Sequence, residues 1–206
     1  MTRWLSLAVF AAVLAPSLAF GQPAEQPPLH AGEWLSGRFV QERHIAGLSA
    51  PLHSEGTFVL AAGKGLIWHS EKPFDTSVII TPAGLLQLVD GREAQRIPAT
   101  RVPFLAQLYD MLAGALGGDS STLARRFSVE RHESSSGWSI LLKPLHPDDP
   151  AAAALQSIAI TGSRFVDTVE VHRPKGDWDQ LRFSDQTRSS ASLPPADAKL
   201  LQMDAP

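Results

Sequence analysis

The sequence predicts an α+β fold: a strongly curved antiparallel sheet forms an unclosed half β-barrel, and helices cap its concave apolar face. Two observations predict it. Short segments of alternating apolar and polar residues follow one another with only Gly- or Pro-containing turns between them. Helical periodicity appears in the middle of the chain rather than after every strand. A run of roughly ten strands has to curl, and the inserted helices then plug the concave face.

The first half of the chain predicts six strands. The turn at 62–65 contains two glycines and makes a hairpin of the second and third strands. Pro73 ends the third strand, and Pro82 and Gly84 mark the turn before the fifth. The predicted strands span residues 34–45, 54–62, 66–70, 76–81, 85–89 and 93–97.

The periodicity then changes from two to about 3.6 residues. Residues 103–116 place apolar side chains at steps of three and four and begin with a proline, which predicts an amphipathic helix. Gly117 and Gly118 end it, and a shorter helix follows up to residue 125. A further short helix is expected within 147–155, and 192–203 gives no prediction. Strands resume at 127–132, 138–143, 157–161, 165–172 and 178–183.

The N-terminal residues predict the compartment. Arg3 precedes an apolar run from residue 4 to 15, which is too short to span a bilayer of ~30 Å. Small residues around Ala19 and Gly21 complete a secretory signal peptide, 1–21. A Pro-rich leader, 22–32, and one domain, 33–206, follow. We therefore expect a secreted protein.

Composition excludes several classes of partner. The net charge is −3, and basic and acidic residues are interspersed, so nothing points to nucleic acid or an anionic membrane. The sequence has no cysteine, which excludes disulfides and lipid attachment to a cysteine of this chain. We expect a soluble monomer.

No motif predicts catalysis or a cofactor. The seven histidines lack the spacing of a metal site, and no serine lies in a G-x-S-x-G motif. Asp148 with Asp149, and Asp177 with Asp179, are close pairs, but both fall in segments that read as solvated loops. The sequence therefore predicts no enzyme, with no catalytic residue, no metal and no cofactor.

The remaining candidates are apolar residues that line a cavity for alkyl chains. For each residue alone, a place in an ordinary core is the more frequent role. On the strands we expect the inner face to be walled by Phe39, Phe58, Trp68, Val78 and Ile80. On the helix at 103–116 we expect a lid formed by Leu105, Leu108, Met111 and Leu112.

Two groups of short patterns resemble the LolA/LolB superfamily, in particular a divergent LolA-like branch of outer-membrane lipoprotein carriers. The first group lies between residues 37 and 81: Phe39-x-Gln41, Pro51-Leu52-x-Ser54-x-Gly56-x-Phe58, Leu66-x-Trp68 and Pro73. The second lies near the C-terminus: Ile158-x-Ile160, Val169-x-Val171, Gly176-Asp177 and Leu181-x-Phe183-x-Asp185. No single pattern is specific, and the resemblance depends on their order and spacing.

The resemblance implies a periplasmic carrier that holds the acyl chains of a lipoprotein, or another amphiphile, and shuttles it between membranes. It implies an inner-membrane ABC-type release complex and an outer-membrane acceptor as partners. The housekeeping carrier has Arg-Pro at the end of its second strand, where this chain has Ala61-Ala62-Gly63-Lys64. The alternatives are a periplasmic adaptor or sensor that binds without transporting, and a periplasmic hydrolase or lipid-modifying enzyme.

Overall fold

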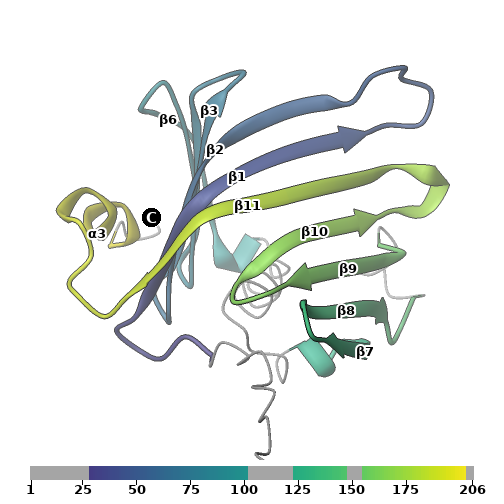
Figure 1. Cartoon of the computed structure of the whole chain (residues 1–206). Coiled ribbons are helices and arrows are strands. Elements are labelled where there is room, and N and C mark those ends of the chain that lie inside the picture. The colour runs from purple at the N-terminus through teal and green to yellow at the C-terminus, as the bar shows by residue number, and fades with distance from the viewer. Residues whose placement is uncertain (1–27, 102–122, 148–154, 203–206) are drawn as a thin grey trace, which may run out of the picture.

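The computed structural model describes residues 28–101, 123–147 and 155–202. These residues form eleven strands, two short 3-10 helices and the helix α3 (Figure 1). The strands are β1 (Trp34–His44), β2 (Leu52–Ala61), β3 (Gly65–Lys72), β4 (Thr76–Thr81), β5 (Gly84–Val89), β6 (Arg92–Pro98), β7 (Phe127–Ser134), β8 (Gly137–Pro144), β9 (Ser157–Gly162), β10 (Val166–His172) and β11 (Trp178–Ser189). The helices are η1 (Ala99–Arg101), η2 (Pro174–Gly176) and α3 (Pro195–Leu201).

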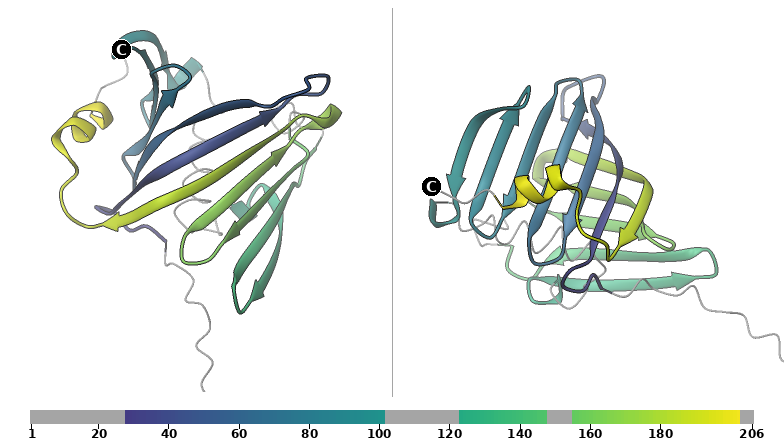
Figure 2. Two further views of the ribbon diagram at one scale, coloured as in Figure 1. Left: turned by 45° about the horizontal axis from the view of Figure 1, so that its top comes forward. Right: turned by 90° about the vertical axis from the view of Figure 1, so that its left-hand side faces the viewer.

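All eleven strands belong to one antiparallel sheet. Its order is β6-β5-β4-β3-β2-β1-β11-β10-β9-β8-β7. Each half is a meander of sequence neighbours, and the two meanders are joined at the centre where β1 pairs with β11. In the described part of the chain β6 and β7 form the two edges, so the sheet is unclosed. Figure 2 shows how strongly it curves, as predicted.

Register shifts contribute to this curvature. The pairing slips at four places: at Ser36/Arg38 in β1–β11, Glu55/Gly56 in β2–β3, Gln87/Leu88 in β5–β6 and Val166/Thr168 in β10–β9. A bulge adds a residue to one strand, bends that strand and increases its local twist. The shifts lie in both meanders, so both halves of the sheet bend.

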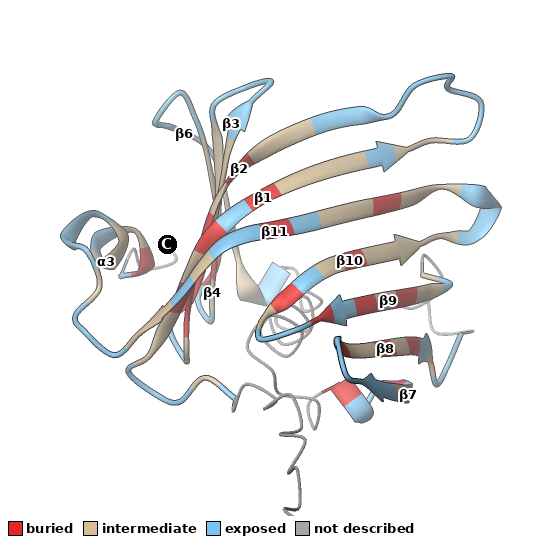
Figure 3. Cartoon of the chain, in the orientation of Figure 1, coloured by how far each residue is buried: buried red, intermediate tan, exposed pale blue. Residues whose placement is uncertain are grey.

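The alternation in the sequence places one apolar cluster on the concave face. Its buried members come from both meanders and from the residue that opens the second described range, Leu123: Leu35, Phe39, Phe58, Leu60, Leu66, Ile80, Leu123, Phe127, Ile140, Leu142, Ile158, Ile160, Val166, Val169 and Phe183. We call it the concave cluster. Figure 3 shows buried positions along both halves of the sheet.

A second, smaller cluster lies on the opposite face of β2–β5. It contains Ala61, Ile67, Ile79, Leu86 and Leu201 of α3. Ile67 and Ile79 are paired neighbours, and they alternate with Leu66 and Ile80, whose side chains belong to the concave cluster. In the right-hand view of Figure 2, α3 lies in front of this part of the sheet, and β7–β10 lie behind it.

The structure therefore assigns α3 to the convex side. The sequence predicted helices on the concave face, and the helix described in the C-terminal segment lies on the other face. The predicted helix 103–116 and most of the predicted helix 147–155 lie outside the described residues. Leu123 and Ala124, at the end of the predicted shorter helix, are helical, and Leu123 belongs to the concave cluster.

Two strands, β3 and β11, exceed their predicted lengths by more than two residues. β3 continues through Glu71 and Lys72 up to Pro73, because the register shift at Glu55/Gly56 lets Lys72 pair with Glu55. β11 runs to Ser189 instead of residue 183, because its polar second half pairs with the first residues of β1. Hydrophobic alternation ends at Phe183, so the sequence pattern alone stops there.

Gly56 generates a first prediction. A Cβ atom at this position would lie 1.9 Å from the carbonyl oxygen of His69 on β3. Gly56→Ala therefore has to push β2 and β3 apart, and we expect it to lower the free energy of unfolding by about 2 kcal/mol or more.

Urea denaturation followed by tryptophan fluorescence measures this change. Thr57→Ala, at the next position of the same strand, is the matched control and should cost less than about 1 kcal/mol. Equal stability of Gly56→Ala and the wild type would contradict the close approach of the two strands.

Candidate functional site

Four aromatic rings occupy the centre of the concave cluster. Phe39 of β1 stacks on Trp68 of β3, with ring centroids 3.9 Å apart. Phe58 of β2 lies edge-on to Phe183 of β11 at 5.4 Å. Trp68 also meets Phe58 and Phe183, each at 6.2 Å. The rings thus cover four adjacent strands and bridge the junction of the two meanders.

All five strand residues that the sequence selected lie at this cluster. Phe39, Phe58 and Ile80 are buried members of it. Trp68 and Val78 are partly buried, pack against it and face each other across the β3–β4 pair. That these side chains contact a ligand stays a prediction. The four predicted lid residues Leu105, Leu108, Met111 and Leu112 lie outside the described residues.

The second meander contributes more buried cluster residues than the first. Sequence reasoning did not select them as cavity residues, although the alternation of Ile158 with Ile160 and of Leu181 with Phe183 was visible in the sequence. The missing information was the β1–β11 pairing, which places these strands on the same curved face. Without it, nothing in the alternation tells which of the two faces a late strand presents.

Several apolar side chains on this face are only partly buried. They pack against the concave cluster without being enclosed, and they include Trp68, Val78, Leu85, Val129, Trp138, Val171 and Leu181. Partly exposed aromatic and aliphatic side chains on a concave surface are the usual lining of sites for apolar ligands. The concave face therefore presents an apolar wall against which another apolar group can be buried.

One carboxylate interrupts the apolar wall at the end where β11 begins. Asp179 is 3% exposed and forms an ion pair with Arg173, and the guanidinium of Arg43 lies 3.8 Å from its other oxygen. The sequence interpretation of Asp177 and Asp179 as a solvated loop pair was wrong for Asp179. β11 starts at Trp178, and pairing with β1 and β10 on both sides buries the residue that follows.

The same end carries a stack of rings on the convex face. The imidazole of His44 on β1 lies parallel to the indole of Trp178, with ring centroids 3.8 Å apart. The imidazole of His172 on β10, on the other side of β11, has its centroid 5.9 Å from that of the same indole. Trp178 pairs with both histidines across the sheet. Among the residues that the structure describes, no group of three or more histidine, aspartate or glutamate side chains forms a candidate metal site.

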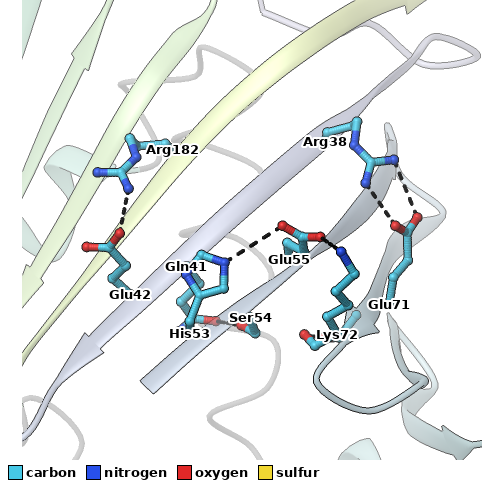
Figure 4. A network of polar contacts seen from close by, with 10 residues as sticks. Arg38, Gln41, Glu42, His53, Ser54, Glu55, Glu71, Lys72 and Arg182 are labelled. Carbon is cyan, nitrogen blue, oxygen red and sulfur yellow. Dashed lines mark hydrogen bonds and ion pairs between the residues drawn. The ribbon is translucent and has the colours of Figure 1, made fainter. Parts of the chain in front are cut away.

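Ion pairs run across β1, β2, β3 and β11 on the convex face (Figure 4). Arg38 binds Glu71 at 2.8 Å and Lys72 binds Glu55 at 2.6 Å. Hydrogen bonds from these cations lower the pKa of both carboxyls below the usual value. These pairs keep the outer surface polar on the strands whose inner surface is most apolar.

Asp179 generates a second prediction. Asp179→Ala leaves Arg173 without its counter-charge while part of that guanidinium is shielded from water. We expect the free energy of unfolding to fall by about 1–3 kcal/mol, measured by urea denaturation.

The matched control is Glu130→Ala. It removes a carboxylate from a solvent-exposed pair with Lys143, and its expected cost is about 0–1 kcal/mol. A loss for Asp179→Ala no larger than that of the control would show that the buried pair contributes nothing.

The Arg38–Glu71 pair generates a third prediction, on pH. Because the pKa of Glu71 is lowered in the folded protein, the pair stabilises the fold above the usual glutamate value of about 4.3. This stability is lost as the pH falls through the lowered value. The difference in urea midpoint between the wild type and Arg38→Gln should be full at pH 7 and shrink below pH ~4. An unchanged difference at pH 3 would contradict it.

Three solved structures that are similar to this chain have sequence identities of 18% or less and TM-scores of 0.40 or less. A LolA superfamily protein from Nitrosomonas europaea has 8% identity and a TM-score of 0.40, covering 82% of this chain and 90% of its own. A lipoprotein-sorting protein domain from Vibrio parahaemolyticus has 8% identity and a TM-score of 0.39, covering 84% and 93%. MucB in the Pseudomonas aeruginosa MucA/MucB complex has 18% identity and a TM-score of 0.35, covering 83% and 56%.

The search of curated proteins found no match. One family model, described as outer membrane lipoprotein carrier protein LolA-like, matches residues 29–203. That range holds every strand of the sheet, both apolar clusters and the helix α3. The chain belongs to the LolA-like family of outer membrane lipoprotein carrier proteins.

Proposed function

We propose that this protein binds the acyl chains of a lipoprotein, or of another amphiphile, on the concave face of its sheet. It shuttles this cargo through the periplasm between the inner and the outer membrane. One observation carries the proposal: the concave cluster is continuous across both meanders, yet it leaves a row of apolar side chains only partly buried. Membership of the LolA-like family supports the same ligand class.

The energetic scale suits a carrier. Transfer of one methylene group out of water contributes about 0.8 kcal/mol, so a chain of roughly twelve to sixteen carbons contributes on the order of 10 kcal/mol before ordering costs. Aromatic rings such as Trp68 supply large contact areas without directional bonds. Binding is therefore strong but not specific for one chain length, and the cargo is released when another apolar surface replaces the wall.

We further propose that the protein is not an enzyme. In the described part of the chain, the buried carboxylate Asp179 already pairs with two arginines. Its two oxygens lie against Arg173 and Arg43, which gives this carboxylate a structural role. The concave face provides an apolar surface from which a bound ligand excludes water.

Loading and release require partners at two membranes. We propose an ABC-type release complex at the inner membrane and an acceptor at the outer membrane. No helix among the described residues is long and apolar enough to cross a membrane. Where the housekeeping carriers have Arg-Pro, this chain has the turn 62–64, so Lys64 would offer only a point charge to a lid.

The alternative function is an adaptor that binds one protein partner and transports nothing. It is favoured by the open sheet, since β6 and β7 each pair on one side only in the part that the structure describes. An open strand edge accepts an extended peptide from a partner. Transfer of labelled lipoprotein between donor and acceptor membranes distinguishes the two, because an adaptor retains its partner and moves no cargo.

Native mass spectrometry of the protein purified from the periplasm tests ligand binding directly. We expect one bound species of lipid mass, which organic extraction removes and identifies. A protein that is free of lipid and does not bind a fluorescent fatty acid would contradict the proposal.

Val78 generates a fourth prediction. Its side chain is partly exposed on the concave face beside Trp68, so Val78→Glu places a charge where the acyl chain lies. We expect at least a tenfold loss of affinity for a fluorescent fatty acid, because a charge facing hydrocarbon is costly. Thr57→Glu is the control: it lies on the convex face between Arg38 and His69 and should bind normally. An equal loss of affinity in both variants would contradict the assignment of the binding site to the concave face.

A further inference from the structure

The large apolar side chains that remain exposed are not scattered over the described surface. They are Leu48, Leu52, Phe74, Val89 and Leu145, with exposed fractions from 37% to 74%. All five lie at the same end of the strands, where β1, β3, β5 and β8 finish. At the opposite end, the turns 62–64 and 82–83 expose no large apolar residue. We call Leu48, Leu52, Phe74 and Val89 the apolar rim.

The rim consists of three hairpin ends. Leu48 and Leu52 belong to the β1–β2 connection and its edge, Phe74 to the β3–β4 connection, and Val89 to the end of β5. In Figure 1 all three tips lie in the upper part of the view, the β3–β4 and β5–β6 connections at its top left and the β1–β2 connection at its upper right, and they lie at the top in the right-hand view of Figure 2. A flat surface can therefore touch all three tips at once.

The β1–β2 connection is held in shape although it protrudes. The amide of Leu48 donates to the carbonyl oxygen of Ile45 at 3.0 Å, which closes a turn. The amide of Ala46 donates to the Asp177 carboxylate in the β10–β11 connection at 2.8 Å. The connection is thus anchored to a second part of the sheet while the Leu48 side chain stays 55% exposed.

Charge on this end is nearly balanced. The connection 45–51 has no charged residue. The neighbouring connections 73–75, 90–91 and 173–177 carry two basic residues, Arg173 and Lys175, and three acidic ones, Asp75, Asp90 and Asp177. A contact with anionic lipid or nucleic acid needs an excess of positive charge. The rim has none, so its attraction to a partner has to come from its apolar side chains.

We propose that the apolar rim docks this protein on a lipid bilayer, with Leu48 and Phe74 entering the headgroup region. Protein interfaces have a contiguous apolar core, whereas here the apolar side chains sit on separate tips with charged residues between them. A fluid bilayer accommodates separate tips individually, and exposed apolar area determines the strength of such binding. The proposal goes beyond cargo binding, since it concerns how the protein meets the membrane and uses none of the concave residues.

Flotation with vesicles of pure phosphatidylcholine tests it. The wild type should float with the vesicles, and binding should persist at high salt, because the contact is apolar. The double variant Leu48→Ser, Phe74→Ser should bind at least tenfold more weakly. The variants are identical outside the substituted positions, so a difference in binding between the wild type and the double variant is due to the rim.

Two controls make the outcome decisive. Lys64→Ser with Ala83→Ser changes two exposed residues at the opposite end and should float like the wild type. The rim variant should still bind the fluorescent fatty acid, whereas Val78→Glu should float but lose the fatty acid, which separates this proposal from the proposed function. The proposal is overturned if the wild type ignores neutral vesicles, if salt abolishes binding, or if the rim variant floats normally.

Discussion

The pairing of β1 with β11 is the interaction on which the rest of the structure depends. It runs from Trp34 opposite Ser189 to His44 opposite Trp178 and joins two meanders that otherwise contain only neighbouring strands. Each meander alone has an apolar face that it cannot bury. The central aromatic group depends on the junction, because Phe39 and Phe183 are directly paired there. Since these strands are the most distant in sequence, closing the junction is also the step with the largest loop-closure entropy.

The junction explains both the successes and the failures of sequence reasoning. Alternation and turn residues predict every strand that the structure describes, because they depend on neighbours within a few residues. They also place Phe58 and Trp68 on one face, because a hairpin with a short turn fixes its own register. The burial of Asp179 could not be predicted in this way. It follows from two long-range strand partners, and the local sequence around Gly176 and Asp177 is that of a solvated turn.

The side taken by α3 was equally hidden from the sequence. Leu200 and Leu201 give the C-terminal segment an apolar pair, but an apolar pair fits either face of a sheet with two apolar faces. The convex face of β3 and β4 presents Ile67 and Ile79, and α3 covers them. The choice depends on which face remains free once the two meanders have curved toward each other, and this is a property of the whole sheet.

Coverage of the convex face by α3 limits the apolar area that this face exposes. With Ile67 and Ile79 covered, and ion pairs such as Arg38–Glu71 across the neighbouring strands, the outer surface offers little apolar area to a ligand. The concave side keeps partly exposed side chains such as Trp68 and Leu181. Apolar contact with a large ligand is therefore directed to the inside of the curve, while contact with a flat surface is left to the hairpin tips. In the function that we propose, the concave face holds the acyl chain and the apolar rim meets the membrane from which the chain comes.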